Sequence, residues 1–146
     1  MTAGAGDRAE DRAGLDALLA AARAAQAQAY APYSRYRVGA ALATPDGRVF
    51  AGCNVENAAY PSGTCAEAGA IAAMAAGGGR AIADIVVVGD GPLPITPCGD
   101  CRQRIREFAT EATRVHSAGP HGIAHSCTVE DLLPRSFGPD HVRHGA

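Results

Sequence analysis

The chain has 146 residues, of which 47% are hydrophobic, and this length suits one compact domain with a single core. Its formal net charge is −2 and it carries no basic tract, so a nucleic-acid partner is not expected. No apolar run reaches membrane length, and the start lacks the basic-then-apolar pattern of a signal peptide. These observations predict a cytoplasmic protein without a membrane partner.

The first half of the chain predicts one helix and a pair of strands. Residues 1–12, rich in Ala, Gly, Asp and Arg, are expected to form a disordered leader. Residues 15–29 carry Ala and Leu at helical spacing and predict a helix that ends before Pro32. Residues 38–44 and 48–55 are strand-like and are joined by a Pro-Asp-Gly hairpin turn.

The second half predicts further helices and strands in alternation. An alanine-rich helix opens at Thr64 and stops at three consecutive glycines, and residues 85–89 form the continuous apolar run of a buried strand. The remaining expected elements are a helix over residues 98–109, strands over 114–118 and 123–128, and a short helix over 130–133. This order predicts an α/β fold with three layers, α/β/α, around a mixed five-stranded sheet. A single domain is expected over residues 13–140, followed by a tail at 141–146.

Three cysteines have the spacing of a metal site. Cys65-Ala66-Glu67 is followed about thirty residues later by Pro97-Cys98-Gly99-Asp100-Cys101. A structural zinc site uses four protein ligands, whereas a catalytic one uses three and leaves a position for water. Both cysteine segments fall at predicted helix starts, where the helix dipole and unpaired N–H groups favour thiolate over thiol. Glu67 follows the first thiol by two residues and is placed to handle protons on a bound water rather than to ligate.

Several motifs around these cysteines occur in a familiar order. A Cys-x-Glu segment followed by Pro-Cys-x-x-Cys is the signature of zinc nucleobase deaminases. The other motifs are Tyr33-Ser34, the segments 38–42 and 52–58, Tyr60-Pro61, Cys101-Arg102-Gln103 and the segment 130–139. With these motifs the chain resembles the cytidine deaminases of the short homotetrameric zinc type, in the cytidine and deoxycytidylate deaminase family. The resemblance covers roughly residues 15–140.

The resemblance implies a zinc-dependent hydrolytic deaminase of pyrimidine salvage. Such an enzyme converts cytidine and deoxycytidine to uridine and deoxyuridine with release of ammonia, so its partner is a small-molecule nucleoside. Cys65, Cys98 and Cys101 are implied as Zn²⁺ ligands and Glu67 as the catalytic residue. Glu67 would take a proton from water, pass it to N3 of cytosine and carry a second proton to the departing amine.

The resemblance also implies contacts to the nucleoside. Asn54 and Glu56 alternate along a strand, so their side chains point to one face, and the family pattern assigns them to the ribose hydroxyls. Tyr36 is expected to stack on the cytosine ring, since tyrosine offers the same aromatic face as the phenylalanine common at this position. The backbone of Ala66 is expected to contact the base.

Two aromatic residues are implied to act between subunits. Tyr60 and Phe137 match aromatics that relatives contribute across subunit contacts. The resemblance therefore implies a homotetramer with shared active sites, in which these two rings complete a neighbour's pocket. Without the resemblance both would be interpreted as core residues.

The chain departs from the family pattern at two positions. Relatives with three zinc cysteines often carry an arginine directly after the catalytic glutamate, and this chain has Ala68 there. Arg37 stands where a proline is usual, beside the expected base-stacking residue. Arg102, directly after a ligand, is the expected substitute cation for offsetting thiolate charge.

Other interpretations of the cysteines remain open at this point. The Cys98/Cys101 pair could be a redox dithiol, or half of a structural zinc knuckle with Cys53 as its fourth ligand. The enzyme could act on a modified cytosine nucleoside of the blasticidin type, or the domain could be a zinc-stabilised binding module without catalysis. Cys53 and Cys127 are otherwise expected to be free thiols, and the five histidines lack ligand spacing and are expected to be non-catalytic.

Overall fold

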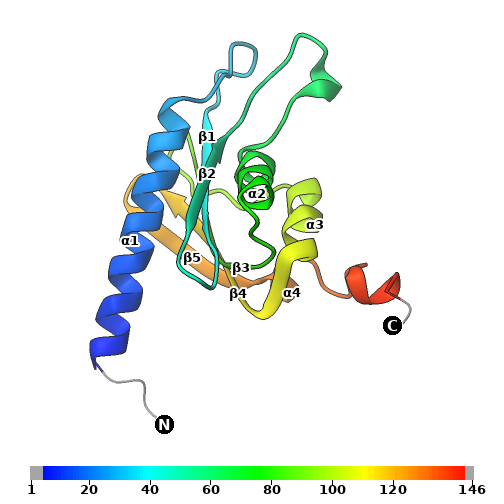
Figure 1. Ribbon diagram of the computed structural model, residues 1–146. Helices are drawn as coiled ribbons and strands as arrows, with labels where there is room; N and C mark the ends of the chain where they lie inside the picture. The colour runs from blue at the N-terminus through cyan, green and yellow to red at the C-terminus, as the bar shows by residue number, and fades with distance from the viewer. Residues whose placement is uncertain (1–4, 144–146) are drawn as a thin grey trace.

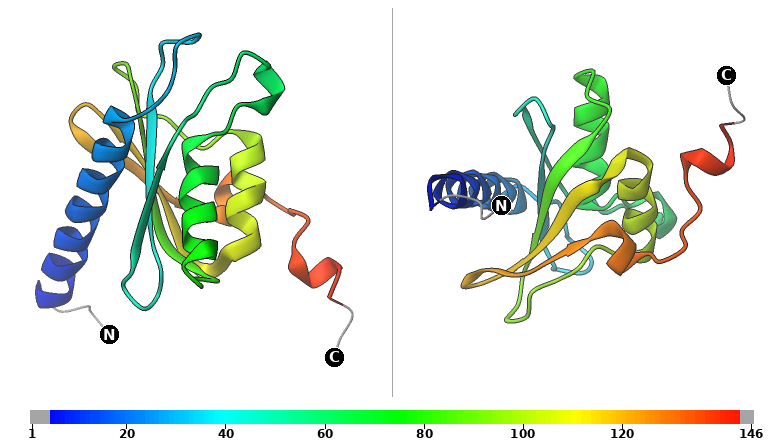
Figure 2. Two further views of the ribbon diagram at one scale, coloured as in Figure 1. Left: turned by 45° about the horizontal axis from the view of Figure 1, so that its top comes forward. Right: turned by 90° about the horizontal axis from the view of Figure 1, so that it is seen from below.

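A five-stranded mixed sheet separates one helix from two others (Figures 1 and 2). The computed structural model describes the backbone of residues 5–143 and the side chains of residues 11–143. The strands are β1 (Val38–Ala43), β2 (Val49–Cys53), β3 (Ile82–Gly89), β4 (Ala109–Gly119) and β5 (Gly122–Thr128). Their order is β2-β1-β3-β4-β5, with β3 and β4 parallel and the other pairs antiparallel.

The helices lie on both faces of the sheet. They are α1 (Ala5–Ala27), α2 (Ala66–Ala76), α3 (Gly99–Phe108) and α4 (Val129–Leu132), with 3₁₀ helices η1 (Tyr60–Ser62) and η2 (Pro139–His141). Helix α1 covers one face, and α2 and α3 cover the other (Figure 2). The predicted α/β/α layers around a mixed five-stranded sheet are thereby confirmed.

Alternation along the strands gives the sheet two apolar faces. Leu42 packs with Met74 of α2, whereas its neighbour Ala41 packs with Leu18 and Ala22 of α1. All five side chains are almost completely buried. Successive residues of a strand point to opposite faces, so one strand supplies both cores. The short apolar runs of the sequence therefore suit strands that are covered on both sides.

A glycine lets helix α2 lie directly against β2. A Cβ built at Gly52 would stand 2.4 Å from the backbone N of Ala70 and 2.5 Å from the backbone O of Ala66. Both are backbone atoms of α2, so no side-chain rotation could relieve the overlap. Because α2 begins immediately after Cys65, this contact positions the first cysteine segment against the sheet.

The first helix is longer than predicted. It begins at Ala5, whereas we expected a helix from residue 15 and a disordered leader over residues 1–12. Residues 5–12 therefore belong to the helix, and residues 1–4 lie outside the described part of the chain. Alanine is the strongest helix former, and the segment contains no proline, so the charged composition that suggested disorder is compatible with a helix.

Strand β4 also begins earlier than residue 114, the expected start. Its pairing with β3 shifts between Ile82 and Asp84, and Thr113 fills the irregularity, with its hydroxyl donating to the Ile82 carbonyl. The bulge interrupts the period-2 pattern on which the sequence prediction depended.

The segment after α4 runs away from the sheet to η2 (Figure 1). Residue His141, assigned to a tail, forms the last turn of η2 and stacks on the Phe137 ring at 5.2 Å between ring centres. The expected tail ends with residues 144–146, which lie outside the described residues. Among the described residues, none of the helices combines the length and the apolar character that a membrane crossing needs.

Gly52→Ala is expected to lower the free energy of unfolding by about 1–3 kcal/mol, because the added methyl overpacks backbone against backbone. Urea denaturation measures the change. The matched control is Gly14→Ala, since a Cβ at Gly14 in α1 meets nothing within 4 Å. That substitution should leave stability equal or raise it by up to about 1 kcal/mol. Equal stability of the two variants would show that α2 does not depend on this close approach.

Candidate metal centre and adjoining cavities

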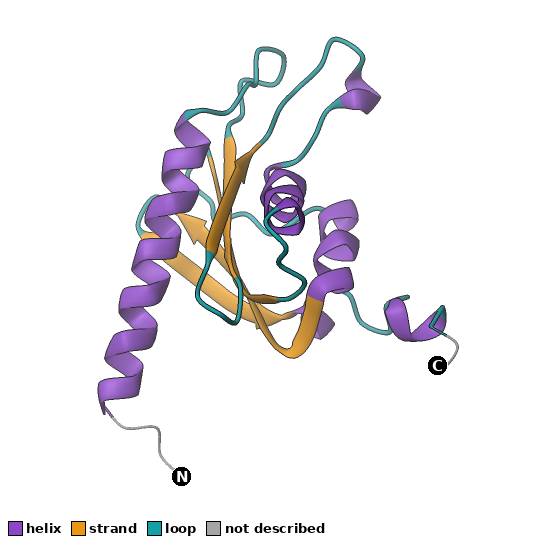
Figure 3. Ribbon diagram, in the orientation of Figure 1, coloured by secondary structure: helices purple, strands orange, loops and turns teal. Residues whose placement is uncertain are grey.

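Two helix starts meet at one end of the sheet. Cys65 is the N-cap residue of α2, Cys98 is the N-cap residue of α3, and Cys101 lies in the first turn of α3. Neither N-cap side chain bonds to its own helix, so both sulfurs are free to turn toward another partner. The loops that leave α1 and β2 reach the same end of the molecule (Figure 3).

The sulfur positions fit a tetrahedral metal. The Sγ atoms of Cys65 and Cys98 are 3.9 Å apart, and all three Sγ atoms lie within 4.8 Å of one another. With zinc–sulfur bonds of about 2.3 Å, tetrahedral geometry requires sulfurs about 3.8 Å apart. Cys53 and the histidines are not part of this group within the described residues. The group thus offers three ligands rather than the four of a structural knuckle.

Burial makes this cluster unfavourable for free thiolates. It raises the pKa of the Cys101 and Cys65 thiols, and the negative charges of Glu67 and of the neighbouring sulfurs raise the pKa of Cys101 further. The helix starts, which favour thiolates, act against this effect of burial. Three deprotonated sulfurs at these distances consequently require a cation, and binding of a metal would release protons.

Glu67 lies beside the sulfurs in a buried position. Its exposed fraction is 3%, and it comes from the first turn of α2. Burial raises the pKa of its carboxyl, while its own backbone N–H and the Cys101 thiol lower that pKa by less. A carboxyl with a raised pKa binds a proton more readily, and this suits a group that must first accept a proton and later return it.

A cavity of about 310 Å³, here called the metal-side cavity, opens beside the thiols. Six of the predicted site residues line it, namely Tyr36, Asn54, Cys65, Ala66, Glu67 and Cys98. The Asn54 side chain accepts from the Val38 N–H at 2.8 Å and donates to the Tyr36 carbonyl at 2.9 Å. Asn54 therefore fixes the backbone that carries Tyr36 as well as facing the cavity.

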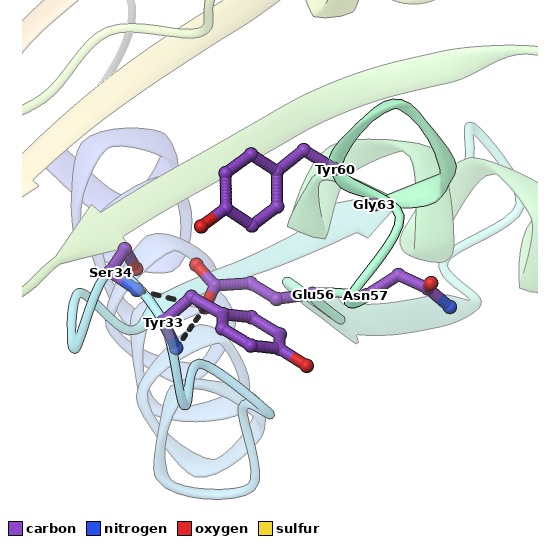
Figure 4. A pocket seen from close by; sticks show the side chains of 6 residues that line it. All are labelled: Tyr33, Ser34, Glu56, Asn57, Tyr60 and Gly63. Carbon is purple, nitrogen blue, oxygen red and sulfur yellow. Dashed lines mark hydrogen bonds between the residues drawn. The ribbon is translucent and has the colours of Figure 1, made fainter.

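Glu56 and Tyr60 line a neighbouring pocket of about 330 Å³, here called the Glu56 pocket (Figure 4). The Glu56 carboxylate accepts the backbone N–H groups of Tyr33 and Ser34 at 2.9 and 3.0 Å. Hydrogen bonds from the Ser34 side chain and from both backbone N–H groups lower the pKa of Glu56, so it is an anion at neutral pH. The Tyr33 and Tyr60 rings approach edge to face, with centres 5.8 Å apart.

Asn54 and Glu56, the two residues expected to contact the ribose, face one loop but different cavities. Both Asn54 and Glu56 turn toward the loop of residues 33–38, as alternation along an extended segment predicts. Asn54 lies in the metal-side cavity and Glu56 in the Glu56 pocket. The loop of residues 33–38 therefore contributes wall residues to both cavities.

Phe137 lies away from both cavities in the single chain. Its carbonyl accepts from the Gln103 side chain at 2.9 Å, and 61% of the residue is exposed. Tyr60 is even more exposed, at 76%. Without the resemblance, both rings would have been interpreted as core residues. Their exposure shows that neither one is.

The structure adds residues that the motifs did not single out. Val38, Ile95 and Thr96 also line the metal-side cavity. Ile95 and Thr96 directly precede Pro97-Cys98. Their position next to a predicted ligand is the one feature of the sequence that could have indicated a place in the site. The Thr96 hydroxyl accepts a hydrogen bond from Arg102 of α3.

Arg102 bonds to neutral oxygens instead of to the thiols. Its guanidinium donates to the carbonyls of Pro97 at 2.8 Å and Leu132 at 2.9 Å, and to the Thr96 hydroxyl at 3.2 Å. It thereby ties the segment entering Cys98 to the end of α4. Arg102 was expected to offset thiolate charge, but the hydrogen bonds of its guanidinium go to these oxygens and not to the thiols.

Arg104 of α3 pairs with the Asp100 carboxylate, from Nε to Oδ2 at 3.1 Å. The Asp100 carboxylate is the main cause that raises the pKa of Arg104, and the Cys101 and Cys65 thiolates add smaller contributions. Ala68 and Arg104 line the same groove between α2 and α3.

Comparison with known proteins identifies similar sequences and folds. The family model for the cytidine and deoxycytidylate deaminase zinc-binding region matches residues 14–117. A cytidine deaminase from Sporosarcina psychrophila is 39% identical over 132 residues, which cover 90% of this chain and 97% of that protein. One from Mycobacterium tuberculosis is 44% identical over 118 residues, covering 80% of this chain and 84% of that protein. The crystal structure of a cytidine deaminase from Burkholderia pseudomallei superposes with a TM-score of 0.79 and 47% identity, covering 84% of this chain and 98% of that one.

The thiol cluster predicts one zinc ion per chain. Cys98→Ala and Cys101→Ala should each lose most of the bound zinc, because two remaining sulfurs cannot hold it against a chelator. Metal analysis of the purified variants measures the loss. Cys127→Ala is the matched control and should retain zinc, since Cys127 lies outside the cluster. Full zinc occupancy in Cys101→Ala would contradict this ligand set.

Proposed function

The chain belongs to the cytidine and deoxycytidylate deaminase family, and we propose that it deaminates cytidine and deoxycytidine in pyrimidine salvage, with zinc held by Cys65, Cys98 and Cys101. The observation that carries this proposal is one arrangement: three sulfurs within 4.8 Å of one another, beside a buried glutamate, at the wall of a cavity. A cavity of about 310 Å³ is of the size that suits a small molecule.

Zinc, when bound, supplies a Lewis acid that lowers the pKa of a coordinated water from 15.7 towards about 7. Glu67, beside the three thiols that would hold the zinc, would accept a proton from the attacking water and deliver it to N3 of the cytosine ring. The water oxygen would bond to C4, and Glu67 would then carry the remaining proton of the water to the exocyclic amine. The C4–N bond breaks, ammonia leaves and C4 becomes a carbonyl. The raised pKa of Glu67 makes its carboxylate a stronger base for taking up a proton, and the carboxylic acid formed by that uptake is the donor for the delivery.

The chain's other residues bind and orient the nucleoside. Tyr36 offers its ring to the base, and Ala66, completely buried at the start of α2, offers backbone groups beside Glu67. Asn54 and Glu56 are assigned to the ribose. Glu56 Oε1 already accepts two backbone N–H groups, so Oε2 is the oxygen left for a sugar hydroxyl.

We assign a homotetramer with shared active sites to the functional form. Two observations support it: Tyr60 and Phe137 expose aromatic rings, and Phe137 lines neither cavity of its own chain. A groove between α2 and α3 is lined by Ala68, Ala72 and Ala75, small residues against which another helix could pack closely. A cytoplasmic location fits the five cysteines, all of which are free thiols in the structure.

Glu67→Gln should keep the fold and the zinc but lower kcat by about 10²–10⁴-fold, because an amide cannot relay the protons. The decrease in ultraviolet absorbance as cytidine is consumed measures kcat, and metal analysis verifies the zinc. Glu107→Gln is the control, as it makes the same change at an exposed position of α3. A Glu67→Gln enzyme with a near-normal rate would exclude Glu67 as the proton shuttle.

Glu56→Gln tests the sugar assignment. The glutamine oxygen can still accept the N–H groups of Tyr33 and Ser34, so the loop is retained while the charged acceptor for the ribose is lost. We expect kcat/KM for cytidine to fall about 10–100-fold, in line with a lost charge-assisted hydrogen bond. Activity on free cytosine, which has no sugar, should barely change. If both substrates were affected equally, Glu56 would be a structural residue.

A further inference from the structure

An ion pair joins the loop of residues 33–38, which contributes wall residues to both cavities, to the segment after β3. The Arg37 guanidinium donates to both carboxylate oxygens of Asp90, from Nε to Oδ2 at 3.1 Å and from a terminal nitrogen to Oδ1 at 3.3 Å. Asp90 follows β3 directly, so the pair joins two segments that are 53 residues apart in sequence. Two parallel hydrogen bonds give this contact a defined geometry that a single-point ion pair lacks.

Backbone and amide hydrogen bonds reinforce the same contact. The Arg37 N–H donates to Asp90 Oδ2 at 2.9 Å, and the Asp90 N–H donates to the Arg37 carbonyl at 3.0 Å. Gln26 at the end of α1 donates to Asp90 Oδ1 at 3.3 Å and to the Arg37 carbonyl at 3.2 Å. Hydrogen bonds from Arg37 are the main cause that lowers the pKa of Asp90, so its carboxylate is ionised at neutral pH. The three residues therefore form one clamp.

The residue next to this clamp is Tyr36. Its ring packs on the end of β3 and the turn that follows, where a Cβ at Gly89 would stand 2.7 Å from the Tyr36 hydroxyl and one at Gly91 would stand 3.9 Å from its ring. The inner side of the Tyr36 backbone is held by Asn54. On the outer side, the clamp ties the next residue to Asp90, between the two glycines.

The conformation of the loop of residues 33–38 depends on contacts with residues outside the loop. Arg35, one residue before Tyr36, has φ of 56°, in the left-handed region that costs a residue with a side chain about 1–2 kcal/mol. Tyr36 itself is 38% exposed, so core packing does not fix it fully. A strained, half-exposed segment keeps one conformation only while its neighbours determine it.

We propose that Arg37 and Asp90 are positioning residues for the nucleoside: their ion pair holds Tyr36 in place as the wall of the metal-side cavity, and this makes nucleoside affinity sensitive to salt. The inference rests on the proposed deaminase function. Neither residue touches the reacting atoms, and both act through Tyr36.

The pair should affect KM rather than kcat. Tyr36 lies beside the base and takes no part in the proton transfers, so its placement contributes equally to binding of the substrate and of the transition state. Arg37→Ala should raise KM for cytidine about three- to fivefold, the upper range for a partly exposed ion pair. Asp90→Ala also removes the acceptor of the Arg37 N–H and of Gln26, so we expect about a tenfold rise.

Salt distinguishes an ion pair from packing. Raising ionic strength from 0.1 to 1 M shortens the screening length from about 10 Å to about 3 Å and weakens exposed ion pairs. Cytidine is uncharged, so screening cannot act on an attraction between enzyme charge and substrate charge. The wild-type KM should therefore rise about twofold over this range, whereas the KM of Arg37→Ala should stay constant.

The experiment measures kcat and KM for cytidine at both salt concentrations in the wild type, Arg37→Ala, Asp90→Ala and the double variant. The double variant should match Asp90→Ala, because the partner of Arg37 is already lost. The control is Arg48→Ala, which removes a comparable Arg–Asp pair, to Asp46 at 3.0 Å. That pair lies in the β1–β2 turn, at the other end of β1 from Tyr36, and its loss should leave KM and its salt dependence unchanged.

A wild-type KM in Arg37→Ala would overturn the inference, as would single effects that simply multiply in the double variant. An equal rise of KM with salt in wild type and Arg37→Ala would also overturn it. These outcomes leave the proposed function intact, because each requires an active wild type. A wild type without cytidine turnover would instead contradict the proposed function itself.

Discussion

The closeness of two helix starts is the constraint on which this structure depends. Three sulfurs and one carboxylate converge there, with two of the sulfurs 3.9 Å apart. Burial raises the pKa of Cys65, Cys101 and Glu67, so the cluster does not hold its negative charges without a cation. The sheet supplies the convergence: β3 leads through the loop to α3, while Gly52 lets α2 approach β2 at backbone contact. The fold thus holds together a group that is unfavourable by itself, and the proposed zinc would offset that cost.

Around this cluster, the walls of the two cavities are built largely from loops. The loop of residues 33–38 stands between the metal-side cavity and the Glu56 pocket, and Asn54, Glu56 and Asp90 all bond to it. Under the proposed function, helices and strands position the catalytic residues, whereas hydrogen bonds between loops position the residues that bind the nucleoside. This division explains why substitutions at the two places should have different kinetic effects: those at Glu67 act on kcat, and those that release the loop act on KM.

Local patterns in the sequence were enough for the layers, the sheet and the metal cluster. Alternation in the segment around Leu42 and the apolar run at residues 85–89 predicted strands, and Cys65, Cys98 and Cys101 were found from spacing and motif order. What remained hidden depends on contacts distant in sequence. The Arg37–Asp90 pair has no local signal, the bulge at Thr113 breaks the strand period, and the charged composition of residues 5–12 masked a helix. The separation of Asn54 and Glu56 into two cavities likewise follows from where the loop of residues 33–38 lies.

The central claim is that three sulfurs hold the metal and leave one position for water. X-ray absorption at the zinc edge of the loaded protein counts the ligands directly, because sulfur at about 2.3 Å and oxygen at about 2.0 Å scatter differently. The account predicts three sulfurs and one light atom, with the same three sulfurs in Cys53→Ala. Four sulfurs in the wild type, reduced to three in Cys53→Ala, would identify a closed structural site and contradict the account.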